Sequence, residues 1–354
     1  MKRIAYIELD THAEIAGNFR ELMEGSAEFA VEYFFAEKIM RQLNYREDKI
    51  VQISSPKMIF SQLKKGHFDL VIIGTVHRYF NVFHQITKHF NTAVIVHNLN
   101  FTKLTKGKLL HKIFVDQTLY RLKLLLKEGL LKMPEVFQKA SHRFVLENSL
   151  AVDSHFQYLP VFYNKFSNEK KMSDSLLIVI PGTVSQSRRD YKKIVGLLEK
   201  EEQLNSEHPE KTFVFLGKAA GEELQILKEL KRKVKRNILV FFNEKVPKSE
   251  FDFWMKKADV LWCPLQLETS FFSNREQYGM TKMSGNIGDA INFGKFVIFP
   301  EVFMSELPYV VSETENVMEK FEEISCLQYD FQAHYSRKKV SESLHQVLRK
   351  CLSD

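Results

Sequence analysis

Short apolar runs recur along the chain, and most of them stop at a glycine, a proline or a polar turn residue. Runs of about four to eight apolar residues bounded in this way are typical of buried strands. Segments with a helical spacing of apolar residues separate many of them. The alternation of strand and helix predicts an α/β fold with parallel sheets. We expect strands at residues 4–9, 50–53, 69–73, 93–96, 143–146, 176–180, 212–216, 238–242, 260–263 and 296–299.

The segments between these strands predict helices. The first helix follows Asp10-Thr11-His12 and is expected to run to about Met40. A basic stretch, 101–133, predicts one or two helices. The remaining helices are expected at residues 56–65, 190–203, 221–235, 249–257, 287–293, 313–323 and 336–352.

A chain of 354 residues is longer than one core usually holds, so we expect two domains. The sequence becomes polar and irregular between Tyr158 and Asp174, and the linker is predicted there, at 164–175. The first domain then covers 1–163 and the second 176–335.

The composition narrows the class of protein and its compartment. With 44% hydrophobic and 27% charged residues the chain reads as an ordinary globular protein. Its 3 cysteines lack metal-type spacing and are expected to be reduced thiols. The first residues are too polar for a signal peptide, and no apolar run approaches the ~18 residues that a membrane span needs. A cytoplasmic protein is expected.

The net charge of +7 is concentrated in one tract, residues 102–140, which holds nine Lys or Arg against three Asp or Glu. Leucines interleave with the lysines, as in a helix that lies on an anionic membrane, so peripheral membrane contact is one interpretation. The other is an ordinary helix with a solvated basic face. Nucleic acid is not expected as a partner, because few aromatic platforms accompany the charge.

The strongest local motif lies between the strands at 260–263 and 296–299. It contains Thr281, Lys282, Ser284, Gly285 and Asn286 just before a predicted helix. A helix N-terminus offers unpaired N–H groups and partial positive charge, and it therefore favours phosphate. An N-cap cluster with a surface lysine is the structural alternative, and the two are compatible.

The layout of residues 258–301 also resembles a known family. A strand that ends at Pro264 leads to Tyr278-Gly279, then to a helix with Asp289, and then to the turn at Gly294. This order is similar to the donor-binding region of GT-B glycosyltransferases, especially the bacterial glycosyltransferase family 4-like group. The usual proline after Gly294-Lys295 is Phe296 here, and the family's pair of glutamates is not intact.

The resemblance implies two Rossmann-like domains that face each other across a cleft, with the nucleotide sugar on the second. The helix at 336–354 would cross back onto the first domain. The turn at Gly182 and Thr183, with Arg188 and Arg189, is similar to the first donor loop of these enzymes. Lys218 would add a phosphate contact, and Glu268 or Asp289 would bind sugar or ribose hydroxyls. The alternative for each charged residue is a solvent-facing surface position.

Two histidines follow strands of the first domain, His12 and His97. His97 is similar in position to a histidine that faces the cleft in many relatives, where it contacts the sugar or the diphosphate. His12 matches the position of the catalytic base in some inverting GT-B families. Lone histidines are more often structural.

The resemblance therefore implies a glycosyltransferase that moves a sugar from a nucleotide-diphosphate donor to a glycan or lipid-linked acceptor in polysaccharide biosynthesis. No cofactor and no metal are expected, because arginine, lysine and helix N-termini can bear the diphosphate charge. A GT-B epimerase of nucleotide sugars and a non-catalytic binding module are the alternatives.

Overall fold

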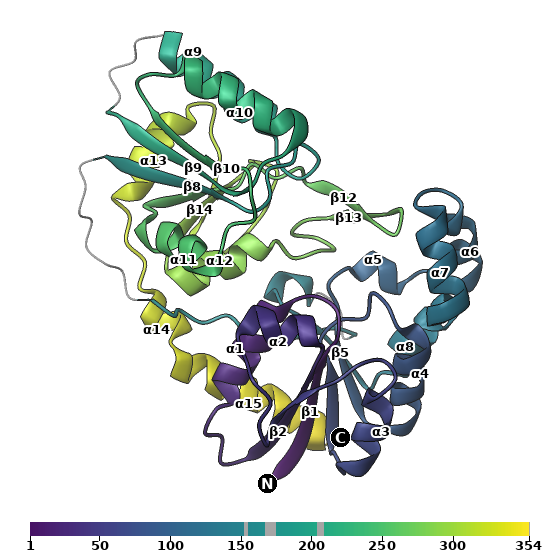
Figure 1. The fold of residues 1–354 in the computed structure, drawn as a ribbon. Coiled ribbons are helices and arrows are strands. Elements are labelled where there is room, and N and C mark those ends of the chain that lie inside the picture. Colours follow the sequence, from purple (N-terminus) through teal and green to yellow (C-terminus); the bar gives the residue numbers. More distant parts are fainter. Residues whose placement is uncertain (152–154, 167–174, 204–208, 354) are drawn as a thin grey trace. The chain divides into compact units, whose positions relative to one another are not determined.

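The computed structural model describes residues 1–151, 155–166, 175–203 and 209–353. The chain forms two compact units, each built around its own parallel sheet (Figure 1). Unit 1 consists of Met1–Phe162, Ser270–Met283 and Arg337–Asp354. Unit 2 consists of Tyr163–Thr269 and Ser284–Ser336.

Unit 1 has a seven-stranded sheet in the order β3-β2-β1-β4-β5-β6-β7. Every neighbouring pair is parallel. The strand order reverses direction between β1 and β4, and in open α/β sheets ligands bind at the carboxyl ends of strands beside such a switch point. The strands are β1 (Lys2–Glu8), β2 (Phe29–Phe35), β3 (Val51–Ile53), β4 (Leu70–Ile73), β5 (Thr92–Ile95), β6 (His142–Val145) and β7 (Gln157–Tyr158).

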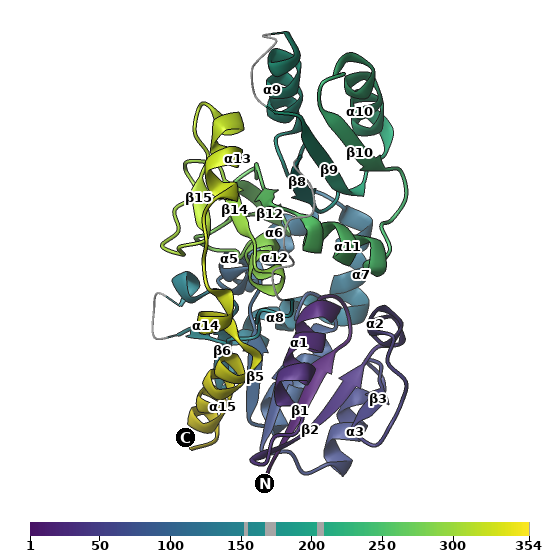
Figure 2. The same cartoon turned by 90° about the vertical axis from the view of Figure 1, so that its left-hand side faces the viewer.

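Helices cover both faces of this sheet, because successive side chains of a strand point to opposite faces. On one face Ala5, Ile7 and Val71 belong to a core that includes apolar residues of α3 (Ile59–Lys65), α4 (Phe80–His89), α6 (Lys106–Ile113), α7 (Thr118–Glu128) and α8 (Met133–Lys139). On the other face α1 (Ala13–Met23) lies beside α15 (Arg337–Ser353) (Figure 2). The shorter helices are α2 (Glu37–Leu43), α5 (Leu99–Thr102), η1 (Leu130–Lys132) and η2 (Asn148–Leu150).

A two-stranded hairpin, β12 (Glu268–Phe271) and β13 (Asn274–Gln277), lies where the sequence predicts only a polar loop. Its two phenylalanines, Phe271 and Phe272, pack against the core of unit 1. Residues 270–283, which we call the hairpin segment, consequently belong to unit 1. The sequence-based boundaries place this segment in the second domain, so it is the main difference between the predicted domains and the observed units.

Unit 2 has a six-stranded sheet in the order β10-β9-β8-β11-β14-β15. Its core contains apolar residues of α9 (Tyr191–Gln203), α10 (Gly221–Lys233) and α13 (Val317–Ser325). The other helices are α11 (Lys248–Lys257), α12 (Gly285–Phe293) and α14 (Phe331–Tyr335). The strands are β8 (Leu176–Pro181), β9 (Lys211–Lys218), β10 (Ile238–Phe242), β11 (Val260–Trp262), β14 (Phe296–Phe299) and β15 (Val310–Ser312).

Some predicted elements are wrong. The single helix expected to run to Met40 is α1, then β2, then α2. Gly25, with φ of 74°, turns the chain between α1 and β2, and such a glycine is a helix stop signal. The helix expected at 313–323 begins at Val317, because Asn316 is its N-cap and accepts from the Glu319 N–H. The basic stretch 101–133 holds several short helices. Most of the predicted linker, 167–174, lies outside the described residues.

Candidate functional site

A buried arginine lies beside the first turn of α12 in unit 2. Arg189 is only 6% exposed, and its Nη2 donates to Asn286 Oδ1 at 2.9 Å. Its Nε has no hydrogen-bond partner among the described residues, and within them its guanidinium forms no ion pair with a carboxylate. Buried charges are normally paired, so this cation is a candidate for binding an anion.

Two glycines allow the backbone to approach this guanidinium. Gly182 follows β8 with φ of 103°, and a Cβ there would lie 2.8 Å from Arg189 Nη2. At Gly217, near the end of β9, a Cβ would lie 2.1 Å from the carbonyl oxygen of Gly182. Side chains at either position would force these loops apart. The two glycines therefore let the β8 and β9 loops come close and leave Arg189 directly over Gly182.

The first turn of α12 completes this cluster. Ser284 is the N-cap and accepts from the Asn286 N–H, and Asn286 Nδ2 donates to Asp289 Oδ2 at 3.0 Å. Asn286 thus connects Arg189 to Asp289. We call Gly182, Arg189, Ser284, Asn286 and Asp289 the arginine cluster. It combines a fixed cation with a helix N-terminus, and both favour a phosphate group.

The other predicted donor residues of unit 2 are exposed: Thr183, Arg188, Lys218, Glu268 and Gly285. Thr183 follows Gly182 directly, and Gly285 is the first residue of α12. The Lys218 carbonyl accepts from the Val184 N–H at 3.1 Å, which joins the two strand-end loops. The two arginines thus differ in environment, because Arg189 is buried whereas Arg188 faces solvent.

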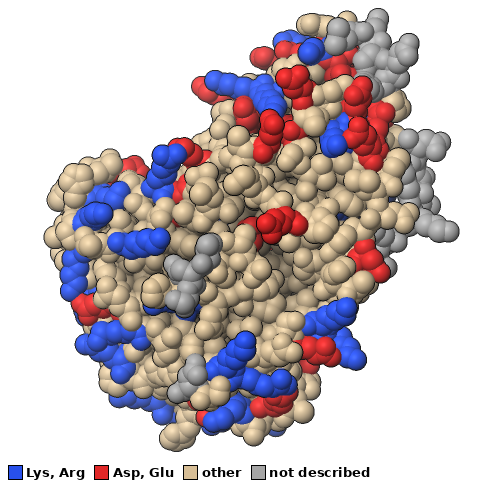
Figure 3. Space-filling view, turned by 180° about the vertical axis from the view of Figure 1, so that it is seen from behind, with Lys and Arg blue, Asp and Glu red and all other residues tan. Residues whose placement is uncertain are grey.

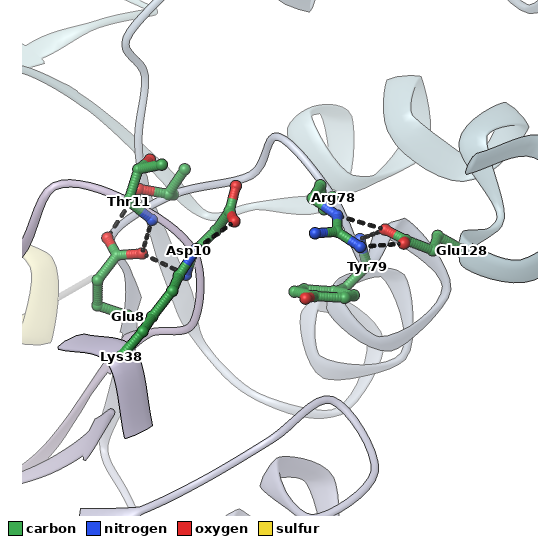
Figure 4. Close-up of polar contacts among 8 residues, drawn as sticks. Glu8, Asp10, Thr11, Lys38, Arg78, Tyr79 and Glu128 are labelled. Carbon is green, nitrogen blue, oxygen red and sulfur yellow. Dashed lines mark hydrogen bonds and ion pairs between the residues drawn. The ribbon is translucent and has the colours of Figure 1, made fainter. Parts of the chain in front are cut away.

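A second group of polar residues lies at the carboxyl edge of the unit 1 sheet, at the switch point. Glu8 ends β1 and is only 1% exposed. Its carboxylate accepts from the Asp10 and Thr11 N–H groups at 2.9 and 3.1 Å (Figure 4). It also accepts from Thr75 Oγ1 at 2.7 Å. Burial raises the pKa of Glu8 to about 8. These bonds fix the turn that leads to His12, whose φ of 62° is left-handed.

Three histidines gather at this edge, and we call them the histidine cluster. His12 follows β1, His77 follows β4 and His97 follows β5. The rings of His12 and His97 are stacked with centroids 3.8 Å apart, and the His77 ring lies 6.0 and 5.7 Å from them. His12 and His97 are candidates from the sequence, whereas His77 is not, although it follows a predicted strand in the same way.

The histidine cluster is neutral near pH 7. Burial, with smaller effects of the neighbouring histidines and Lys282, lowers the pKa of His12 and of His77 to about 3 and holds that of His97 well below its usual value. His97 Nε2 lies 2.8 Å from the Gly74 carbonyl oxygen, which can only accept, so this nitrogen carries the proton. His77 Nε2 accepts from Asn98 Nδ2 at 3.3 Å. Among the described residues, the ring nitrogens of His12 have no hydrogen-bond partner.

The hairpin segment brings a lysine toward the histidine cluster. Lys282 Nζ lies over the Tyr278 ring, 5.3 Å from its centroid, and Gly279 between them has φ of 78°. Thr281 anchors the segment, because its carbonyl accepts from the Leu99 N–H at 2.9 Å and its hydroxyl from the Gln277 N–H at 2.8 Å. The sequence motif from Thr281 to Asn286 is therefore divided, with Lys282 in unit 1 and Ser284 in unit 2.

Glu276 is the anchor that the sequence does not reveal. It is fully buried, and its carboxylate accepts from the N–H groups of Asn100 at 3.3 Å and Phe101 at 2.9 Å. Its position within a polar stretch gives no signal of burial. Across the described part of the chain, no three histidine, cysteine or acidic residues are arranged to hold a metal ion.

No protein-family model matches this sequence, and neither does any curated protein. Many solved structures resemble the chain in fold, among them the following three. TarM matches with a TM-score of 0.56 and 9% identity, over 100% of this chain and 99% of its own. A UDP-N-acetylglucosamine 2-epimerase matches with a TM-score of 0.51 and 10% identity, over 98% of this chain and 96% of its own. The N-terminal domain of Candida albicans trehalose-6-phosphate phosphatase matches with a TM-score of 0.53 and 9% identity, over 99% of this chain and 97% of its own.

Identity this low carries information about fold alone. The likeness extends over nearly the whole of each chain, and both sheets of the present structure are parallel with helices on their faces. The predicted α/β class with two Rossmann-like units is therefore confirmed, and the chain has the GT-B fold.

Proposed function

We propose that this protein is a glycosyltransferase, of the kind found in the bacterial family 4-like group, that takes a sugar from a nucleotide-diphosphate donor. The observation that carries the proposal is the buried guanidinium of Arg189, which lies against Gly182 and the first turn of α12 and has no carboxylate partner in the described chain. Unit 2 would hold the diphosphate there. The GT-B fold supports the proposal, because it supplies the strand-end loops that form the cluster.

The proposed chemistry follows from the leaving group. As the bond between the sugar and the diphosphate breaks, negative charge grows on the phosphate oxygens. A fixed guanidinium and the N–H groups of a helix start stabilise this charge more strongly in the transition state than in the ground state. Arginine also binds phosphate in a bidentate way. We propose that these groups supply the positive charge for which other transferases use a divalent metal.

His12 is the proposed base that takes the proton of the acceptor hydroxyl. Its nitrogens make no hydrogen bond within the described residues, so a lone pair is available. Burial lowers the pKa of His12 to about 3 in the empty protein, so the proposed role requires the bound anionic donor to raise that pKa toward the working pH. His97 Nε2 donates to the Gly74 carbonyl, and the His97 ring stacks on His12, so His97 is proposed to hold the base in place. Its other nitrogen, Nδ1, is proposed to contact the sugar or the diphosphate. The acceptor is proposed to be a glycan or a lipid-linked saccharide.

A nucleotide-sugar epimerase is the second candidate, and Glu8 favours it. Sugar epimerisation needs groups that exchange protons, and Glu8 is a carboxyl at a strand end whose pKa burial raises to about 8. Against this role, both carboxylate oxygens already accept hydrogen bonds from Asp10, Thr11 and Thr75. Glu8 is therefore better explained as the group that shapes the turn before His12.

The test incubates the purified protein with UDP-, GDP-, ADP- and dTDP-sugars and identifies the products. Release of free nucleoside diphosphate supports a transferase, and His12→Ala should then abolish turnover while the donor still binds. An altered sugar that retains its diphosphate would instead establish an epimerase. Thermal stabilisation by a nucleotide without turnover would indicate a binding module. If no nucleotide sugar binds or reacts, the proposal is wrong.

A further inference from the structure

The surface of α6 and α7 in unit 1 has an unusual distribution of apolar side chains. Leu119 is 86% exposed, Leu126 80% and Phe114 70%, and Val115 beside Phe114 is 56% exposed. Leu119 and Leu126 are seven residues apart on α7, so they share one face of that helix. Phe114 and Val115 lie at the turn between the two helices. Together these four residues form a patch that we call the apolar tip.

The opposite face of α7 buries two charged side chains together with Leu124. Arg121 is 3% exposed, donates to the Lys112 carbonyl and to Ser273 Oγ, and lies 4.6 Å from the centroid of the Phe272 ring. Glu128 is 6% exposed and accepts two hydrogen bonds from Arg78, at 3.1 and 2.5 Å, and one from the Tyr79 N–H (Figure 4). Leu122, Leu124 and Leu125 of α7 still pack against the core of unit 1. Leu119 and Leu126 do not, and they lie on the face of the helix opposite Arg121 and Glu128.

Another basic helix, α10, serves as a comparison. Along α10 the lysines Lys228 and Lys231 face solvent, whereas Leu227 and Leu230 are each 1% exposed and belong to the core of unit 2. That arrangement is ordinary, because the apolar face is buried and the basic face is solvated. Basic composition therefore does not by itself expose leucines.

Positive charge surrounds the apolar tip. Lys123 and Lys127 lie on α7 between and beside the exposed leucines, and Lys103 and Lys108 are exposed on the preceding turn and α6. Three acids lie between 102 and 140, and each has a cationic partner. Glu128 pairs with Arg78, and Glu135 pairs with Lys106 and His84. Asp116, in the turn that holds Phe114 and Val115, is exposed but lies 3.4 Å from Arg121. Lys and Arg side chains gather on the part of unit 1 that contains these helices, with few acidic ones among them (Figure 3).

We propose that the apolar tip and its lysines dock this protein on an anionic lipid bilayer. Exposed leucine and phenylalanine side chains would enter the boundary between headgroups and acyl chains, while the lysines contact lipid phosphates. A lipid surface is favoured over a protein partner because the lysines require an anionic surface at the same level as the apolar groups. No helix in the described residues has the length and hydrophobicity to cross a bilayer, so contact would be peripheral. Docking is independent of the proposed sugar transfer.

The test uses the full-length protein and vesicle sedimentation. Wild type should sediment with vesicles of phosphatidylcholine mixed with phosphatidylglycerol, bind pure phosphatidylcholine at least about tenfold more weakly, and be released by high salt. The double variant Leu119→Ser with Leu126→Ser should lower binding by about tenfold or more, because each leucine buries apolar area in the bilayer. Lys123→Gln with Lys127→Gln should abolish the preference for phosphatidylglycerol.

Lys228→Gln with Lys231→Gln on α10 is the matched control, and binding should be unchanged in it. All the substituted side chains are exposed, so thermal melting should confirm that each variant is folded. Failure of wild type to bind anionic vesicles would overturn the proposal. So would binding that neither double variant on α7 reduces, or sedimentation velocity showing that the exposed leucines instead hold two copies of the chain together.

Discussion

Replacement of Arg189 by methionine separates a binding role from a structural one. Methionine is similar in length and apolar, so it fills the buried space and removes only the charge and the hydrogen bond to Asn286. A structural arginine stabilises the fold, and its loss lowers the free energy of unfolding. An arginine kept for an anion has the opposite signature, because it destabilises the empty protein and stabilises the complex.

The magnitude follows from the environment of Arg189. A guanidinium and a phosphate about 4 Å apart attract by about 4 kcal/mol at an effective dielectric constant of about 20. Desolvation removes part of this, which leaves about 2 to 3 kcal/mol, or about 30- to 150-fold in affinity. In the empty protein, loss of the hydrogen bond to Asn286 lowers the free energy of unfolding by about 1 kcal/mol. Removal of a buried charge that has no ionic partner raises the free energy of unfolding and offsets this loss.

The assay measures nucleotide affinity by calorimetry with UDP, GDP, ADP and dTDP, and stability by urea unfolding of the empty protein. In Arg189→Met, affinity for the preferred nucleotide should fall about 30- to 150-fold, while the free energy of unfolding changes by no more than about 1 kcal/mol or rises. Arg232→Met is the control, because that side chain is exposed on α10, outside the arginine cluster, and its loss should change neither quantity.

The opposite pattern would refute the reasoning. If Arg189→Met loses several kcal/mol of stability and binds the nucleotide as tightly as wild type, the arginine is a structural residue of unit 2. The arginine cluster would then not be the diphosphate site.

Three further predictions follow. Gly182→Ala should weaken nucleotide binding, because φ of 103° strains an L-residue and the new Cβ would meet the Arg189 guanidinium. Calorimetry measures the loss of affinity. Gly196→Ala is the control, because a Cβ at Gly196 has open space around it. Glu276→Ala should cost about 2 to 4 kcal/mol in urea unfolding and speed hydrogen exchange at the Asn100 and Phe101 amides; equal exchange rates would show that the carboxylate does not anchor the hairpin segment. His77→Gln should make the protein less acid-sensitive. The pKa of His77 is lowered to about 3 when folded, so below about pH 6.5 the unfolded chain takes up a proton that the folded chain excludes, and stability falls by up to about 1.4 kcal/mol per pH unit. Melting at pH 7 and pH 5 measures this difference, and an unchanged pH dependence would contradict the assigned burial.

The hairpin segment and β2 show where sequence reasoning fails. The stretch from Phe29 to Phe35 is rich in aromatic residues and follows Gly25, so a stop signal and a strand signal are both present but compete with a helical spacing over a longer window. The hairpin has no comparable signal. Its strands pair only with each other, and its polar residues suggest a solvated loop.

The sequence alone determined most strands of both sheets and the α/β class, because buried strands and their turn residues are local patterns. It also marked the residues at strand ends, including Gly182, Arg189 and His97. Only the tertiary structure showed that Arg189 is buried while Arg188 is exposed, and that His77 lies beside His12 and His97. It also showed that Glu276 is buried and that Lys282 belongs to unit 1. The exposure of Leu119 and Leu126 on α7 likewise became visible only there. Burial and the identity of a partner depend on residues far apart in the chain, and the local pattern of a sequence does not contain that information.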